Sequence, residues 1–149
     1  MSVNAELVGR VFAPTAPYQV GREKIREFAH AVFASNPVNL DVAAAQAAGY
    51  PDLVAPATFP IVLQQFTLEQ LLAEPDANLD FSRVVHGEQR FRYSRPIVAG
   101  DLLTAQLSVT SIKSLGGNDM VTSDAVISDA DGAHVVTATS TLVVRGGEA

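Results

Sequence analysis

The stretch Phe59–Glu74, FPIVLQQFTLEQLLAE, decides the fold class of this protein. A helix formed by it would be apolar around most of its circumference, because its apolar residues include Phe59, Val62, Leu63, Phe66, Leu68, Leu71 and Leu72. Such a helix is usually buried and does not lie on a surface. Thr58 and Pro60 suit the start of this helix, and Pro75 ends it. We therefore expect one buried helix near the middle of the chain.

The sequence after Phe81 changes to the period-two alternation of β-strands. Apolar and polar residues alternate in DLLTAQLSVTSI, MVTSDAVIS and HVVTATSTLVV, and Asp131-Gly132 is a typical hairpin turn. In VVHGEQRFRY, strict alternation places His86 and Glu88 on one face with Arg90 and Arg92. The opposite face would hold Val85, Gly87, Gln89, Phe91 and Tyr93. We expect a meander of four long, half-buried antiparallel strands.

The chain before the central helix predicts smaller elements. A short strand is expected near Tyr18–Val20, followed by a helix from about Arg22. Four residues at helical spacing form its apolar stripe: Ile25, Phe28, Val32 and Phe33. Pro37 is expected to close this helix, since the residue before a proline disfavours helical backbone. Asp41 is a good N-cap for a second short helix that stops at Gly49.

Helices followed by antiparallel strands predict an α+β protein. An antiparallel curved sheet wrapped around the buried helix would satisfy both patterns. We find no internal repeat and no linker, so residues 1–149 are expected to form a single domain.

Composition excludes several classes of function. Of 149 residues, 48% are hydrophobic and 17% charged, and the net charge is -6, which disfavours binding to nucleic acid or to an anionic membrane. The absence of cysteine excludes disulfides and thiolate sites. We expect no metal, because His30, His86 and His134 lie far apart in the sequence. Without a secretory signal or a membrane-spanning run, we expect a cytoplasmic protein.

The order of several motifs resembles the MaoC-like hot-dog dehydratases and hydratases. These motifs are REKIREFA, SNPVNLD, AP-x-TF and RPIVAGD, and the resemblance covers almost the whole chain. It is strongest to a single-domain actinobacterial group that includes the accessory, non-catalytic subunits of mycobacterial (3R)-hydroxyacyl-ACP dehydratase. The resemblance implies a hot-dog fold, assembly into dimers, and acyl thioesters of coenzyme A or acyl carrier protein as ligands, without a cofactor.

Active members of this family carry the pattern Gly-Asp-x-Asn-Pro-apolar-His. Its Asp and His would supply the proton transfers of hydration and dehydration. Asn36, Pro37 and Val38 match the middle of the pattern, and Asp41 matches an Asp common just beyond the His. By the same resemblance, Phe33 occupies the Gly position, Ala34 the position of the catalytic Asp, and Asn39 that of the His. Neither Ala34 nor Asn39 can serve as an acid or a base.

Three hypotheses about function remain open at this point. The leading one is an acyl-thioester-binding accessory subunit of a (3R)-hydroxyacyl-ACP or -CoA dehydratase, paired with a catalytic MaoC-like subunit. The alternatives are a non-catalytic homodimer that binds acyl-CoA, and a self-sufficient homodimeric enoyl-CoA hydratase that uses His86 and Glu88. A hot-dog thioesterase ranks low, because its carboxylate would have to be Glu69, deep in the central helix.

Candidate binding residues follow from the resemblance and from backbone chemistry. Free N–H groups at a helix start attract the oxygen of a thioester, which favours Ala57 to Phe59. The full set of candidate substrate-binding residues is Asn39, Pro56, Ala57, Thr58, Phe59, His86 and Gly87. Arg90, Arg92 and Arg95 could meet phosphates of the carrier, although alternating Arg residues more often form a solvated face.

Overall fold

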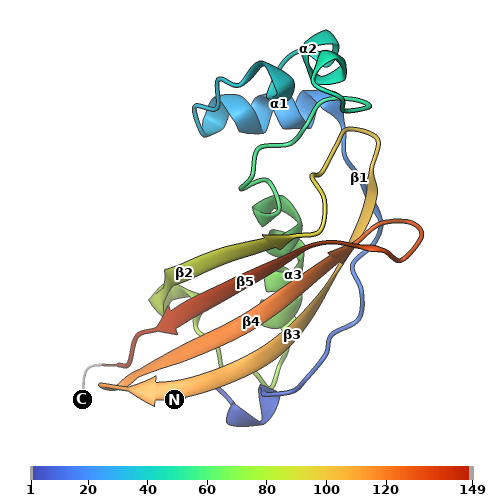
Figure 1. Ribbon diagram of the computed structural model, residues 1–149. Helices are drawn as coiled ribbons and strands as arrows, with labels where there is room; N and C mark the ends of the chain where they lie inside the picture. The colour runs from blue at the N-terminus through green and yellow to red at the C-terminus, as the bar shows by residue number, and fades with distance from the viewer. Residues whose placement is uncertain (1, 148–149) are drawn as a thin grey trace.

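A curved antiparallel sheet of five strands forms one side of the molecule (Figure 1). The computed structural model describes residues 2–147. The strands are β1 (Tyr18–Gln19), β2 (Val84–Tyr93), β3 (Leu102–Leu115), β4 (Asn118–Ser128) and β5 (His134–Val144), and their order in the sheet is β1-β3-β4-β5-β2. β3, β4 and β5 form the predicted meander. The predicted position of β2 beside β3 is wrong, because β2 pairs with β5. The connection 94–101 is too long for a tight hairpin and is tied to Val54 by a β-bridge at Val98.

The predicted central helix lies against the concave face of this sheet (Figure 1). The helical segments are η1 (Ala5–Leu7), α1 (Arg22–Ala31), η2 (Pro37–Asn39), α2 (Val42–Ala47), α3 (Ile61–Ala73) and η3 (Phe81–Arg83). Leu63, Thr67 and Leu71 of α3 are buried against the sheet, whereas Phe66 remains 37% exposed. The predicted α+β arrangement is therefore confirmed, although α3 is not covered on every side. Within residues 2–147, no helix is long and apolar enough to cross a membrane.

Helix α1 ends earlier than predicted, and Pro37 is not its stop signal. The N–H of Ala34 bonds to the carbonyl of Ala29 at 2.8 Å, and the N–H of Phe33 bonds to that of His30 at 3.2 Å. This pattern is a Schellman motif, in which the residue after the cap adopts left-handed backbone. Phe33 takes that conformation with φ of 58° and leaves its ring 93% exposed. The prediction that Val32 and Phe33 belong to the buried stripe is wrong, since both are exposed.

Pro37 instead begins the next turn of the chain. Asn36 caps η2 by accepting a hydrogen bond from the N–H of Val38 at 3.2 Å, and Pro37 follows as the first residue of that turn. Proline suits this position because its missing N–H needs no partner there. The predicted N-cap at Asp41 is confirmed by a 3.0 Å bond from the N–H of Ala43. Two caps and a Schellman motif thus shape the segment from Phe33 to Asp41.

A β-bulge at Gly87 changes which side chains of β2 share a face. His86 is paired with Leu142 and Glu88 with Thr141, so Gly87 is the extra residue in β2. Because neighbouring residues of β5 point to opposite faces, His86 lies on the inner face and Glu88 on the outer face. The prediction that His86 and Glu88 share a face is therefore wrong. Past the bulge, Gln89, Phe91 and Tyr93 continue the inner face that His86 begins.

Candidate functional site

An open cleft of about 610 Å³ lies where the loop after α1 faces the start of α3 and the end of β2. The loop side contributes Ala34, Asn36, Val38 and Asn39. The opposite side contributes the segment before α3 and the end of β2, and the full lining is Ala34, Asn36, Val38, Asn39, Tyr50, Val54, Ala55, Pro56, Ala57, Tyr93, Ser94, Arg95 and Pro96. The structure therefore brings together four sequence-predicted positions, Ala34, Asn39, Pro56 and Ala57. Among residues 2–147, no carboxylate and no histidine lines the cleft.

Asn39 is a fixed part of the cleft wall. The residue is only 7% exposed, and its Nδ2 donates to the carbonyl oxygen of Val54 at 2.6 Å. The N–H of Val54 in turn donates to the carbonyl of Val38 at 3.0 Å. These two bonds join η2 to the segment that leads into α3, so they hold the two walls of the cleft in register. An amide has no protonation change near neutral pH, so Asn39 can position groups but cannot transfer a proton.

The peptide between Ala57 and Thr58 is held by Tyr93. The Tyr93 hydroxyl donates to the carbonyl oxygen of Ala57 at 2.6 Å. Burial raises the pKa of Tyr93 above its usual value of 10.0, so the phenol stays protonated and remains a donor. In a trans peptide the N–H points away from the carbonyl, so this bond also fixes the direction of the Thr58 N–H.

Two backbone donors are available beside this peptide. Among residues 2–147, no acceptor bonds to the N–H of Ala57 or to that of Thr58. Both precede α3, whose aligned peptide dipoles favour negative charge near its start. A carbonyl oxygen that gains negative charge during a reaction is stabilised by such prearranged N–H groups.

Two of the remaining candidate residues at the start of α3 are placed differently. Thr58 is exposed, next to the cleft. Phe59 is fully buried and packs edge-on against Phe28, with ring centroids 5.3 Å apart. Phe59 is therefore a core residue that anchors the start of α3, and it does not line the cleft.

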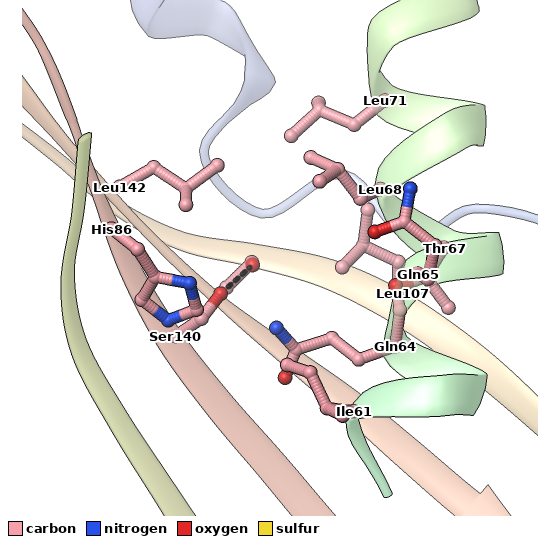
Figure 2. A pocket seen from close by; sticks show the side chains of 11 residues that line it. Ile61, Gln64, Gln65, Thr67, Leu68, Leu71, His86, Leu107, Ser140 and Leu142 are labelled. Atoms are coloured by element: carbon pink, nitrogen blue, oxygen red, sulfur yellow. Dashed lines mark hydrogen bonds between the residues drawn. The ribbon is translucent and has the colours of Figure 1, made fainter. Parts of the chain in front are cut away.

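His86 lines a different space from the cleft. A second, smaller cavity of about 150 Å³ lies between α3 and the sheet. Figure 2 shows the His86 ring directed into it from β2. Its other lining residues are Ile61, Gln64, Gln65, Thr67, Leu68, Leu71, Leu107, Ser123, Ser140 and Leu142. The His86 Nε2 lies 3.2 Å from the carbonyl of Glu88. The structure therefore does not bring His86 together with Asn39 or with the Glu88 side chain.

Gly87 approaches the neighbouring strand closely. A Cβ atom at this position would lie 3.1 Å from Val143 Cγ2 and 3.3 Å from the carbonyl oxygen of Thr141. The open space that a ligand would need at Gly87 is therefore taken by β5. Gly87 shapes the bulge and lines neither cavity.

The arginines of this region are mostly engaged by carboxylates. Arg95 binds Asp101 through two bonds of 2.8 and 3.1 Å and Asp129 through one of 3.3 Å. Hydrogen bonding to Asp101 raises the pKa of Arg95. The pKa of Asp129 is lowered, first by the N–H of Ala133 and then by Arg95. Arg90 pairs with Glu88 at 3.2 Å on the outer face.

A serine on the cleft rim is linked to His134. The Ser94 hydroxyl hydrogen-bonds Nδ1 of His134, whose Nε2 lies 2.7 Å from the hydroxyl of Thr137. Both ring nitrogens are thus occupied within the protein. Glu69 is exposed on α3 and lines neither cavity. Among residues 2–147, no group of three His, Cys, Asp or Glu side chains could hold a metal ion.

Three residues that form hydrogen bonds around α3 and β2 were not among the candidate site residues predicted from the sequence: Tyr93, Gln64 and Gln89. Tyr93 orients the peptide before Thr58, and the two glutamines bond to each other across the space between α3 and β2. The sequence did contain a signal for them. Gln64 interrupts an otherwise apolar helix, and Gln89 shares a strand face with Phe91 and Tyr93.

Comparison with known proteins assigns this chain to a family. The family model for the FAS1-like, dehydratase domain region matches residues 6–138. The chain belongs to the FAS1-like dehydratase family. A UPF0336 protein of Leifsonia xyli subsp. xyli is 66% identical over 146 residues, which cover 98% of both chains. A UPF0336 protein of Streptomyces coelicolor is 49% identical over 148 residues, which cover 99% of both chains.

Solved structures confirm the hot-dog fold of this FAS1-like dehydratase chain. It is similar to a chain of the C-terminally truncated HadBC (3R-hydroxyacyl-ACP dehydratase) complex from Mycobacterium tuberculosis, with a TM-score of 0.85 and 32% identity. The match covers 92% of this chain and 96% of that one. A MaoC-like dehydratase gives a TM-score of 0.84 at 35% identity, where the match covers 94% of this chain and 42% of the larger one. The predicted resemblance and hot-dog fold are thus confirmed, and a dehydratase-type role is supported.

Proposed function

We propose that this protein is the acyl-thioester-binding, non-catalytic subunit of a (3R)-hydroxyacyl thioester dehydratase, active only beside a catalytic hot-dog partner. The observation that carries the proposal is the chemistry of the cleft. The cleft has backbone donors just before α3, and within the described residues 2–147 its lining contains no carboxylate and no histidine. Dehydration of a hydroxyacyl thioester needs a base and an acid beside the substrate. The cleft can therefore hold a thioester while the partner supplies the proton transfers.

The placement of Ala34 and Asn39 supports this proposal. By the family pattern these are the positions of the catalytic Asp and His, and both line the cleft beside Pro56 and Ala57. The loop keeps the caps that give it its shape, and Asn39 is held by Val54. In this proposal the loop has retained its binding shape and has no acid–base groups. The thioester oxygen would accept hydrogen bonds from the N–H groups of Ala57 and Thr58.

The unpaired edge of β2 supports the proposal that this protein binds a partner subunit. β2 lies at the end of the strand order, and among residues 2–147 it pairs only with β5, so within this part of the chain its other edge is open over Val84–Tyr93. An open edge of this length readily pairs with a strand of another chain. The HadBC structure is itself a complex of two subunits. We propose that a hot-dog partner, either a catalytic subunit or a second copy, covers β2.

The geometry disfavours the self-sufficient enzyme that uses His86 and Glu88. The bulge places these two side chains on opposite faces of β2, and neither lines the cleft. A single substrate could not contact both groups from the cleft.

A paired activity assay tests the proposed function. The chain is purified alone and also after co-expression with a hot-dog protein that retains the Asp and His of the family pattern. Hydration of a trans-2-enoyl-CoA is followed by loss of the enone absorbance. We expect activity in the co-purified complex and none in the chain alone. Robust hydration by the chain alone, abolished by His86→Ala, would instead establish the self-sufficient enzyme.

A further inference from the structure

Phe33 is the most exposed large apolar residue within residues 2–147. It is 93% exposed, compared with 72% for Leu115 and 57% for Phe81, and the preceding Val32 is 43% exposed. An aromatic ring left in water forgoes the large favourable free energy that its burial would give. Scattered exposed apolar residues are normal on a protein surface, so exposure alone assigns no role to Phe33.

The backbone of Phe33 is the second unusual feature. Its φ of 58° lies in the left-handed region, at the position of the Schellman motif where glycine is the usual residue. Glycine adopts this conformation without strain, whereas a bulky side chain does not. Neither packing nor backbone conformation in the folded chain therefore explains a phenylalanine here. Strained residues of this kind concentrate at functional sites, where a binding partner or ligand uses them.

The position of Phe33 relates it to the cleft. The next residue, Ala34, lines the cleft, and by the family pattern it stands where the catalytic Asp would be. Phe33 itself does not line the cleft, so its ring is not a wall against which a bound thioester would lie. Tyr93, the last residue of β2, lines the same cleft. The open edge of β2 and the exposed Phe33 ring thus both adjoin the cleft, and one partner chain could contact both.

We infer that Phe33 is the anchor through which this protein binds its catalytic partner, a hot-dog chain that retains the Asp and His of the family pattern. This inference rests on the proposed function, which requires such a partner beside the cleft. A partner that covers Phe33 comes within one residue of Ala34, where the acid–base groups are needed. Aromatic side chains seated in a pocket of the partner are prominent among the residues that dominate binding. We expect the partner to bury the Phe33 ring in an apolar pocket, with Val32 at its edge.

The chemistry of the cleft favours this partner over a second copy of the chain. A second copy could also cover the Phe33 ring. It would bring Ala34 and Asn39 again, however, so the two copies together would still have Ala and Asn at the positions of the family's acid–base pair. A partner that carries the Asp and His supplies the proton transfers that dehydration requires.

Two substitutions of Phe33 remove the ring without disturbing the fold. Phe33→Gly also relieves the left-handed backbone, and Phe33→Asn keeps a side chain that tolerates this conformation. Leu115→Ala is the control, because it shortens another highly exposed apolar residue. Leu115 ends β3 at the turn into β4, and Figure 1 shows this turn at the opposite end of the sheet from α1 and α2.

Affinity for the partner tests the anchor. The probes are the hot-dog proteins of the same genome that retain the Asp and His, and each is titrated into the purified wild-type chain by calorimetry. The partner that binds is then titrated into each variant. We expect Leu115→Ala to bind as the wild type does, and Phe33→Gly and Phe33→Asn to bind at least about 30-fold more weakly. Thermal unfolding of each free variant shows that the fold is retained, so that a loss of affinity reports on the lost ring.

The outcomes separate this inference from the proposed function. Wild-type affinity in Phe33→Asn, or an equal loss in Leu115→Ala, overturns the anchor and leaves the proposed function intact. If Phe33→Gly abolishes self-association in the ultracentrifuge but leaves affinity for the partner unchanged, the ring binds a second copy and the inference is also overturned. Absence of binding between the wild type and every such hot-dog protein overturns the proposed function and the anchor with it.

Discussion

The side-chain amide of Asn39 donates to the backbone carbonyl of Val54 at 2.6 Å, in a position only 7% exposed to solvent. This bond joins the η2 turn to the segment that leads into α3. The two walls of the cleft are thus connected through one side chain, and the cleft geometry depends on it.

Replacement of Asn39 tests this connection. In Asn39→Ala the Val54 carbonyl loses its buried donor, so we expect the free energy of unfolding to fall by about 1–3 kcal/mol. Urea unfolding measures the change. Gln19→Ala, at an exposed position of β1, is the control and should change stability by less than about 0.5 kcal/mol. Equal stability of Asn39→Ala and wild type would show that the bond does not hold the loop.

Replacement of Phe33 should increase stability, in contrast to replacement of Asn39. Its left-handed backbone, with φ of 58°, is unfavourable for a bulky residue, and its exposed ring gains little from packing. Phe33→Gly should therefore raise the free energy of unfolding by about 1 kcal/mol. Val32→Gly is the matched control, because Val32 has an ordinary φ of -102°. The control should lower stability, and a loss of stability in both variants would contradict the strain argument.

Gly87 should not tolerate a side chain. An added Cβ would meet Val143 Cγ2 at 3.1 Å and the Thr141 carbonyl at 3.3 Å, so Gly87→Ala should lower stability by about 1–3 kcal/mol. Gly21→Ala is the control, since nothing lies within 4 Å of its Cβ position and its φ is -97°. Thermal unfolding of the two variants makes the comparison. A neutral Gly87→Ala would mean that β5 can move away from the bulge.

Tyr93 links stability to alkaline pH. Burial raises its pKa in the folded protein above the usual 10.0, so the unfolded chain loses this proton first as the pH rises. The contribution of protonated Tyr93 to the free energy of unfolding is therefore fully present below pH 10. It is lost as the pH rises from about 10 toward the higher pKa of Tyr93 in the folded protein. Urea unfolding between pH 8 and 11 should show a steeper fall in stability for wild type than for Tyr93→Phe. Parallel curves would contradict the burial of this phenol.

The antiparallel sheet and the buried helix were readable from the sequence because their signals are local and periodic, whereas the hot-dog fold was implied by the family resemblance. The inner faces of β3 and β4 were predicted correctly, since Leu103, Leu107 and Ile127 follow strict alternation and are buried. The predictions of which side chains share a face failed where a single residue interrupts the strand alternation or the helical spacing. Gly87 adds a residue to β2 and moves His86 to the inner face, and Phe33 ends α1 in a backbone conformation typical of glycine.

Only part of the cleft could be anticipated. Ala34, Asn39, Pro56 and Ala57 were expected at a binding site, and they do line one cleft. The bond of Tyr93 to Ala57 and that of Gln64 to Gln89 join residues on different elements. Such pairs depend on how α3 lies against β2, and no local pattern specifies that. The same packing places His86 at the inner cavity, apart from the candidate binding residues Asn39, Pro56 and Ala57, which line the cleft.

The most direct test of the central claim is binding without turnover, measured in one sample. Trans-2-octenoyl-CoA is titrated into the purified chain by calorimetry, and the enone absorbance of the same sample is then followed over time. We predict saturable binding and an enone absorbance that does not change, because the cleft offers N–H donors but, in the part of the chain that the structure describes, no carboxylate or histidine. Absence of binding, or loss of the enone at a catalytic rate, would contradict the account.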